Sequence, residues 1–395
     1  KHRWEIIMNS DSTAAASSSK RDLGLDYTRI LAFLLVVTVH FFLHSGFYGN
    51  AMQGEKMYIM TAICTLCMSC VPLFLLLTGF LTRNNRTELT AKGYFSYLKK
   101  LRKILLTAVF CEAATGFYAF YRLKSISLSQ FIINSVSFEH RGVENYGWYV
   151  EMYIGLFMLI PFLAILSRAF DKRAHGVCIA VLLFLTAAPS VFNAVKFSAF
   201  PQIISGGATQ IFPDWWTNIL YPVTYWFIGS YIGNYVDTKK LNTFRLAMLT
   251  VISTVIFSVF NIIKSRGKTF DGGFWDDYGA VENTVTSVLL FLLVNSINYR
   301  THSKKYNSFI KLISELTFGA YLLSLISDKE YHIFLKARIP ALGDRFWLLP
   351  VVTAASAVTA LVLSFVVKLL VLLVERALDK IGEKIKGHKK DSLPV

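Results

Sequence analysis

The sequence predicts an all-α, polytopic integral membrane protein with about ten transmembrane helices, and three observations support this prediction. Apolar residues make up 54% of the 395 residues and charged residues only 17%, with a mean hydropathy of +0.47. A soluble globular chain typically contains about 25% charged residues. The apolar residues gather into blocks of about 20 residues, the length that crosses a bilayer as a helix. The Lys and Arg residues concentrate on one side of these blocks, as is typical of inserted membrane proteins.

Ten apolar blocks follow one another along the chain, and each is expected to form one membrane-spanning helix. They are residues 24–44, 57–81, 104–121, 147–166, 176–193, 218–236, 244–263, 280–298, 309–327 and 346–374. The eighth and ninth blocks depart most from a purely apolar span, because Glu282, Lys311 and Glu315 lie inside them or near their ends.

The basic residues between the blocks predict the orientation of the chain in the membrane. If the blocks alternate in direction, 25 Lys and Arg residues lie on the side of both termini and 12 on the opposite side. The richer side should be cytoplasmic, so both termini are expected in the cytoplasm. The net charge of +16 then reflects topology and attraction to the lipid bilayer, and no basic soluble domain is present to bind nucleic acid.

Three regions are predicted. Residues 1–22 form a polar, Ser- and Ala-rich cytoplasmic tail that should be disordered, and the stretch before Met8 resembles residues added ahead of a native start. Residues 23–376 form the transmembrane domain, and residues 377–395 form a basic cytoplasmic tail.

The first block carries ionisable residues on one face. His40 follows Arg29 by eleven residues, which on a helix leaves their side chains about 20° apart and about 16 Å apart along the axis. Asp26 lies three residues before Arg29 on the same face. Its negative charge can offset part of the free-energy cost of placing the Arg29 charge in the membrane. Because ionisable groups are expensive there and are retained mainly where they have a function, this face should lie against protein or water and not against lipid.

No metal site is predicted. His44 lies one turn beyond His40 and could bind an acceptor or a metal, but two histidines without a third ligand do not indicate zinc. Cys64, Cys67 and Cys70 recur every three residues, which spreads their thiols over half of the helix circumference. They are better explained as small apolar residues in a packed helix.

Two further segments have the composition of binding surfaces. Glu151 follows Trp148 and Tyr149 closely at the start of the fourth block, and is the best candidate for the cavity that contains His40. The outer loop 264–279 combines aspartates with aromatic residues, including Trp275, which suits a polyhydroxylated ligand. Aromatic residues of the membrane interface would give the same composition.

The order of these segments resembles the membrane acyltransferase-3 family. The run RDLGLDYTRILAFLLVVTVH (21–40) is similar to its Arg-x10-His opening motif with a preceding Leu-Asp. Further pieces match in order: VPLFLLLTGFLT (71–82), YFSYLKKLRKIL (94–105), YGWYVEMYIGLFMLIPFL (146–163) and LTFGAYLLS (316–324). Thr78 replaces the usual Ser of the second piece, and Ser324 replaces a common His of the last. The resemblance covers nearly all of residues 21–376.

The resemblance implies an acyl-CoA-dependent O-acyltransferase of the bacterial cytoplasmic membrane. Such enzymes move a small acyl group, often acetyl or succinyl, to a carbohydrate or cell-envelope acceptor. It implies acetyl-CoA or a similar donor substrate, no bound cofactor, and catalytic roles for His40, Arg29 and Asp26. His40 would act as the general base on an acceptor hydroxyl. The alternative is a structural histidine bonded to a neighbouring helix. The basic loop would hold the donor phosphates through Lys99, Arg102 and Lys103, although topology alone would place basic residues there. The residues expected to line the cavity or contact the acceptor are His44, Trp148, Tyr149, Glu151, Tyr321 and Trp275.

A proton-coupled transporter of a small polar solute or glycan is the alternative function, with His40 and Glu151 as proton relays. The sequence shows neither an inverted repeat nor paired Gly- or Pro-broken spans, which are typical of such transporters. A polytopic scaffold without catalysis would leave the polar face of the first span unexplained. The acceptor, the choice of acyl group, any separate extracytoplasmic protein and the oligomeric state stay open.

Overall fold

The computed structural model describes residues 22–136, 146–193, 213–270, 277–299 and 303–391, and in these ranges the chain is helical with short connections. Two isolated β-bridges join residues 51–52 to residues 266 and 269. The α-helices are α2 Leu23–Ser45, α3 Glu55–Cys67, α4 Cys70–Thr82, α5 Ala91–Leu98, α6 Leu101–Tyr118, α7 Leu128–Val136, α8 Trp148–Ala169, α9 Lys172–Thr186, α10 Ala188–Phe192, α11 Thr217–Tyr235, α12 Thr243–Ser265, α13 Val281–Ser296, α14 Lys304–Arg338, α15 Leu342–Arg345 and α16 Leu349–Asp391.

The predicted fold class, an all-α polytopic membrane protein, is confirmed. Each of the ten apolar blocks contains a helix, and α3 and α4 together form the second block. Within the described part of the chain, seven helical segments are long and apolar enough to cross a membrane. The blocks at α9–α10, α11 and α13 fall short of that length or hydropathy, because their helices are shorter or carry more polar residues.

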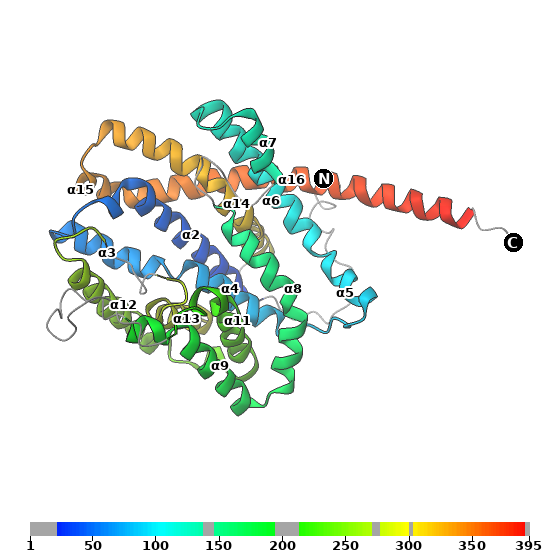
Figure 1. Cartoon of the computed structure of the whole chain (residues 1–395), viewed down its shortest axis with the longest axis horizontal. Helices are drawn as coiled ribbons and strands as arrows, with labels where there is room; N and C mark the ends of the chain where they lie inside the picture. Colours follow the sequence, from blue (N-terminus) through cyan, green and yellow to red (C-terminus); the bar gives the residue numbers. More distant parts are fainter. Residues whose placement is uncertain (1–21, 137–145, 194–212, 271–276, 300–302, 392–395) are drawn as a thin grey trace.

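Helix α2 lies at the centre of the bundle (Figure 1) and packs against α4, α14, α16 and α13. Its ends are defined by local chemistry. Asp22 caps the N-terminus by accepting a hydrogen bond from the Gly24 amide at 2.9 Å. Gly46 ends the helix in the left-handed conformation, with φ of 88°, which glycine adopts without a steric cost. The polar face of the first block is therefore enclosed by other helices.

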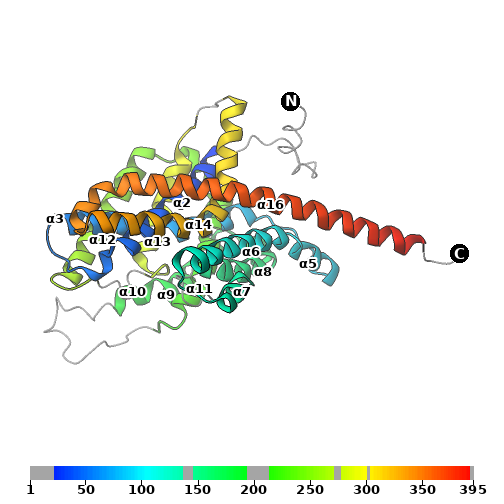
Figure 2. The ribbon, with the colours of Figure 1, turned by 90° about the horizontal axis from the view of Figure 1, so that it is seen from above.

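Helix α16 is the longest element and extends beyond the rest of the bundle in both views (Figures 1 and 2). Its 43 residues span about 65 Å, roughly twice the hydrocarbon thickness of a bilayer. It runs across the boundary predicted at residue 376, so that boundary stays a prediction. Residues 1–21 and 392–395, which belong to the two predicted tails, lie outside the described residues.

The charged residues of the eighth and ninth blocks have partners inside the protein. Glu282 is buried, and its two carboxylate oxygens lie 3.1 and 3.0 Å from the Asn261 side-chain amide. Glu315 lies 2.7 Å from the Lys368 ammonium and 3.6 Å from that of Lys311. Paired or hydrogen-bonded charges of this kind are compatible with membrane spans.

Helices α4 and α11 approach closely through glycines. A Cβ atom at Gly79 would fall on the Trp226 carbonyl, and one at Gly229 would fall on the Leu76 carbonyl. Small residues permit such close packing of membrane helices.

We therefore expect Gly229→Ala to destabilise the protein by about 1–3 kcal/mol, because the methyl group meets rigid backbone. Gly155→Ala on α8 is the matched control, since a Cβ there meets nothing within 4 Å. Thermal unfolding of both variants in the same detergent measures the difference. Equal melting temperatures would contradict this account of the α4–α11 contact.

Candidate active site

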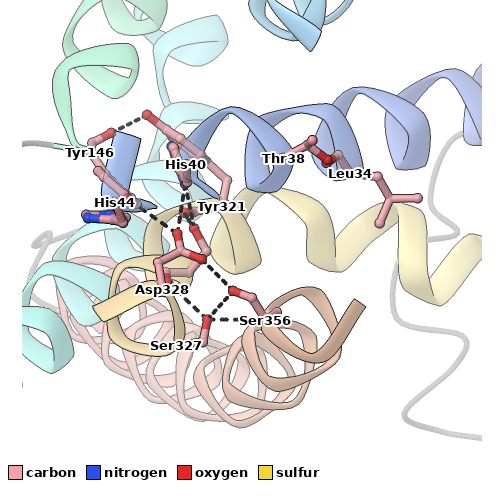
Figure 3. Close-up of polar contacts among 10 residues, drawn as sticks. Leu34, Thr38, His40, His44, Tyr146, Tyr321, Ser327, Asp328 and Ser356 are labelled. Carbon is pink, nitrogen blue, oxygen red and sulfur yellow. Dashed lines mark hydrogen bonds and ion pairs between the residues drawn. The ribbon is translucent and has the colours of Figure 1, made fainter. Parts of the chain in front are cut away.

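His40 is held by two side chains of α14. Its Nδ1 atom lies 3.0 Å from Asp328 Oδ2 and 3.2 Å from Ser324 Oγ. Figure 3 shows Asp328 and His40 pointing toward each other from two different helices. The Ser324 hydroxyl donates its only proton to the Tyr321 carbonyl at 2.9 Å, so its oxygen can only accept from His40. Nδ1 therefore carries the imidazole proton in the neutral ring. The lone pair is then on Nε2, the nitrogen that can act as a base.

Asp328 is the centre of a buried hydrogen-bond network. Its side chain is 3% exposed, and both of its carboxylate oxygens accept hydrogen bonds. Oδ1 accepts from the Ser356 hydroxyl of α16 at 2.6 Å, and Oδ2 accepts from His40 and from the Tyr146 hydroxyl at 3.2 Å. Ser327 lies 2.7 Å from Ser356 and can donate to it. Three donors around one carboxylate are typical of its ionised form.

Tyr146 connects His40 to His44. Its hydroxyl donates to Asp328 and accepts from His44 Nε2 at 2.7 Å. Its ring lies 4.0 Å from the His40 ring and is nearly parallel to the Tyr321 ring at 6.2 Å. The Tyr321 hydroxyl donates to the Tyr146 backbone carbonyl. The imidazole of His40 is thus fixed by a carboxylate at one edge and an aromatic ring against its face.

A cavity of about 350 Å³ lies between α2, α4, α6, α8, α14 and α16. Its walls are mainly apolar, and four charged residues line it: Arg29, Lys103, Glu315 and Lys368. Val36 and Tyr321 also line it, and both lie nearer to His40 along their helices than the charged residues do. The Tyr321 ring is 6.2 Å from the His40 ring. The cavity therefore extends from a charged end, near the start of α6, towards His40, which does not itself line it.

The predicted catalytic and donor-binding residues divide into two groups. Arg29 and Lys103 line the cavity, and Arg29 Nη1 donates to Ser314 Oγ at 3.0 Å. Asp26 is buried one turn away but does not line the cavity. Lys99 is exposed. Arg102 faces α16 instead, 2.9 Å from Asp379 and 3.7 Å from Glu375.

The predicted cavity and acceptor residues also divide. Tyr149 and Tyr321 line the cavity, and His44 is buried against Tyr146. Trp148 stacks on Tyr278 with ring centroids 5.6 Å apart. The expectation that Glu151 shares this cavity does not hold, because the residue is exposed. Residues that are two positions apart on a helix point in directions about 200° apart. Because Tyr149 points into the protein, Glu151 points outward. Trp275 lies outside the described residues.

Sequence reasoning missed Asp328, Tyr146 and Ser356. Asp328 follows the predicted ninth block by one residue, which places it in an outer loop rather than in a span. Its position one turn after Ser324 places both residues on one helix face, and this spacing was the available signal. Among the described residues, no group of three or more His, Cys, Asp and Glu side chains is placed to hold a metal ion.

Comparison with known proteins gives one family and one relative. The family model described as an acyltransferase domain matches residues 22–369. The relative is the probable poly-beta-1,6-N-acetyl-D-glucosamine export protein of Staphylococcus aureus (strain MRSA252). It is 20% identical over 310 residues, which cover 76% of this chain and 81% of that protein. No solved structure matches the chain.

Proposed function

This chain belongs to the acyltransferase-3 family and is a multi-pass membrane acyltransferase, and from this premise we propose which groups it transfers and how. The donor is cytoplasmic acyl-CoA, acetyl-CoA in the simplest case. The acceptor is a hydroxyl group of an exported or cell-envelope carbohydrate. His40 is the general base. The observation that carries the proposal is the buried His40–Asp328 pair, in which the His40 ring lies 6.2 Å from the ring of Tyr321, a residue that lines the charged cavity.

The pair supplies the proton transfers that the reaction needs. Asp328 holds Nδ1–H, so Nε2 takes the proton of the acceptor hydroxyl as its oxygen bonds to the thioester carbonyl carbon. The tetrahedral intermediate collapses with cleavage of the carbon–sulfur bond. The imidazolium then returns its proton to the CoA thiolate, and the ionised Asp328 stabilises the imidazolium meanwhile. The ester and free CoA leave, and His40 is restored.

The cavity fits the donor in charge and length. Lys103, Lys368 and Arg29 line its charged end and can attract the CoA phosphates. The apolar walls suit a pantetheine arm. Arg29 and His40 are about 16 Å apart along α2, a distance comparable with that arm. The thioester would then lie near Tyr321 and His40 while the nucleotide stays at the cytoplasmic rim.

We expect Lys103→Gln to raise the KM for acetyl-CoA about three- to tenfold with little change in kcat. A phosphate contact far from the thioester is equally strong in the ground and transition states, so its loss weakens binding only. Arg102→Gln is the matched control, since Arg102 pairs with Asp379 and Glu375. Initial rates over a range of acetyl-CoA concentrations measure both constants. Equal effects of the two changes would assign the basic loop to topology alone.

The acceptor is proposed to meet the enzyme from outside the cell. The excess of Lys and Arg on the side of both termini supports a cytoplasmic position for the termini, which would put His44 towards the outer face. The relative named as a probable poly-beta-1,6-N-acetyl-D-glucosamine export protein supports a glycan as the acceptor class.

Membrane vesicles test the proposal directly. Inverted vesicles expose the cytoplasmic face, so labelled acetyl-CoA added outside them should label carbohydrate. Right-side-out vesicles should not show this labelling until they are permeabilised. Labelling by intact right-side-out vesicles would reverse the orientation, and absence of labelling in both preparations would reject the proposed donor.

Glycan export is the second candidate, because the relative is named an export protein. It predicts movement of a labelled oligosaccharide across proteoliposomes without acyl-CoA. The acyltransferase proposal predicts that oligosaccharide is modified only when acyl-CoA is supplied. The two measurements on one preparation separate these functions.

A further inference from the structure

A second cavity, of about 820 Å³, lies at the end of α2 that the topology places outside the cell. One wall is the segment that leads into α3, including Asn50 and Gln53, and the other is the segment around α15. Arg345, at the end of α15, lines the cavity as well. This cavity is separate from the one that contains Arg29 and Lys103.

Arg345 is a buried cation in this wall. Its residue is only 6% exposed, and Nη2 donates to the Ser45 carbonyl at 2.9 Å. Nε is buried and has no hydrogen-bond partner in the described part of the chain. No carboxylate there lies within ion-pair distance of the guanidinium either. Since a buried charge without a counter-ion is costly, the site is suited to an anionic ligand that completes the guanidinium fork.

The other charged groups of the cavity do not replace that ligand. Lys56 and Asp344 face each other at 3.2 Å and neutralise one another. Glu55 is exposed at the rim, where solvent and salt screen its charge. Asn50 and Gln53 provide amide groups that can bind sugar hydroxyls. The cavity thus combines a buried cation with neutral polar groups.

The position of Arg345 relates this cavity to the catalytic histidine. Its partner Ser45 follows His40 by five residues on α2, a rise of about 7.5 Å. His44 lies between His40 and Ser45 on α2, and its ring centroid is 5.7 Å from that of His332. His332 is 4% exposed, and its Nδ1 atom has no hydrogen-bond partner in the part of the chain that the structure describes. An oligosaccharide whose anionic group is bound at Arg345 could place a neighbouring sugar unit near His40.

We infer that the outer cavity binds the acceptor, and that this acceptor is a glycan bearing an anionic group, a carboxylate or phosphate, which Arg345 holds. The inference rests on the proposed acyl transfer for its biological meaning. The binding itself requires neither acyl-CoA nor turnover, so it can be measured separately.

The test compares an acidic and a neutral oligosaccharide of equal length. Tetragalacturonate and maltotetraose are titrated calorimetrically into the full chain in phosphatidylcholine nanodiscs without acyl-CoA. We expect tetragalacturonate to bind at least about tenfold more tightly, as a charge-assisted fork would give. Arg345→Gln can still donate to the Ser45 carbonyl, and it should remove this difference. Arg338→Gln is the matched control, because Arg338 is exposed at the end of α14.

A second substitution at Arg345 tests the inference independently of the first. If Arg345→Gln fails to fold, Arg345→Lys carries the test, because it keeps the charge but not the fork. It should weaken tetragalacturonate binding several-fold and leave maltotetraose unchanged. Equal affinities of the unmodified protein for both sugars would overturn the inference. So would an Arg345→Lys variant that binds tetragalacturonate as tightly as the unmodified protein, or an Arg338→Gln variant that loses as much affinity for it as Arg345→Gln. If Arg345→Gln weakens binding of phosphatidylglycerol and leaves binding of tetragalacturonate unchanged, Arg345 is assigned to a lipid headgroup phosphate instead.

Discussion

Replacement of His40 by alanine is expected to lower kcat for acyl transfer by about 10²–10⁴, the usual loss for a general base. Asp328 fixes the His40 imidazole, and the His40 ring lies 6.2 Å from the ring of Tyr321, which lines the proposed donor cavity. Alanine removes the proton acceptor and leaves the donor cavity intact, so the KM for acetyl-CoA should change little. Transfer of labelled acetyl groups by purified, detergent-solubilised protein measures the effect.

A second buried histidine provides the control for this variant. His175 on α9 is 0% exposed, and its Nε2 atom lies 3.2 Å from the Phe227 carbonyl oxygen. It lies in a different part of the bundle from His40. His175→Ala should lower the melting temperature and keep kcat near its original value. His40→Ala should show the reverse pattern, with a normal size-exclusion profile. If folded His40→Ala keeps more than about a tenth of the original turnover, His40 is structural and the mechanism is wrong.

Asp328→Asn should also lower kcat by about 10²–10⁴, although the asparagine side chain has nearly the same size and shape as that of aspartate. The carboxylate accepts the Nδ1 proton of His40, which leaves the lone pair on Nε2. An asparagine amide can donate to Nδ1, and the ring then carries its proton on Nε2 and cannot accept another. The substitution also removes the negative charge that stabilises the imidazolium. Single-turnover measurements with bound acetyl-CoA separate this loss from any change in donor binding.

Ser356→Ala provides a graded comparison. It removes one of the hydrogen bonds that Asp328 accepts, at 2.6 Å, and leaves His40 and Tyr146 in place. We expect a loss of about tenfold, because a hydrogen bond to an ionised carboxylate contributes about 1.5 kcal/mol. Asp328→Asn activity within about threefold of the original would instead show that Ser324 alone suffices to orient His40.

Local patterns in the sequence predicted the membrane helices and one face of the site. Length and hydropathy identify a span because a helix that crosses the hydrocarbon core needs about 20 predominantly apolar residues. The helical period then places Arg29 and His40 on one face of α2 without knowledge of any neighbour. That face does lie inside the bundle, with Arg29 lining the cavity and His40 against α14.

The same reasoning could not choose between neighbouring basic residues. Arg102 and Lys103 are adjacent in the sequence and about 100° apart around α6. Lys103 lines the cavity, whereas Arg102 pairs with α16. The face of α6 that meets the cavity depends on how α6 rotates against α14 and α16, and charge alone carries no such information.

The sequence by itself determined an all-helical membrane protein, the resemblance to an acyltransferase family and a histidine at membrane depth. Only the tertiary structure decided the partners of that histidine. Asp328 is 288 residues from His40 and meets it because α14 packs along α2, while α16 supplies Ser356 to the same carboxylate. The physical reason is that hydropathy and helical period act within one segment, whereas a hydrogen bond between segments depends on how helices distant in the sequence pack together.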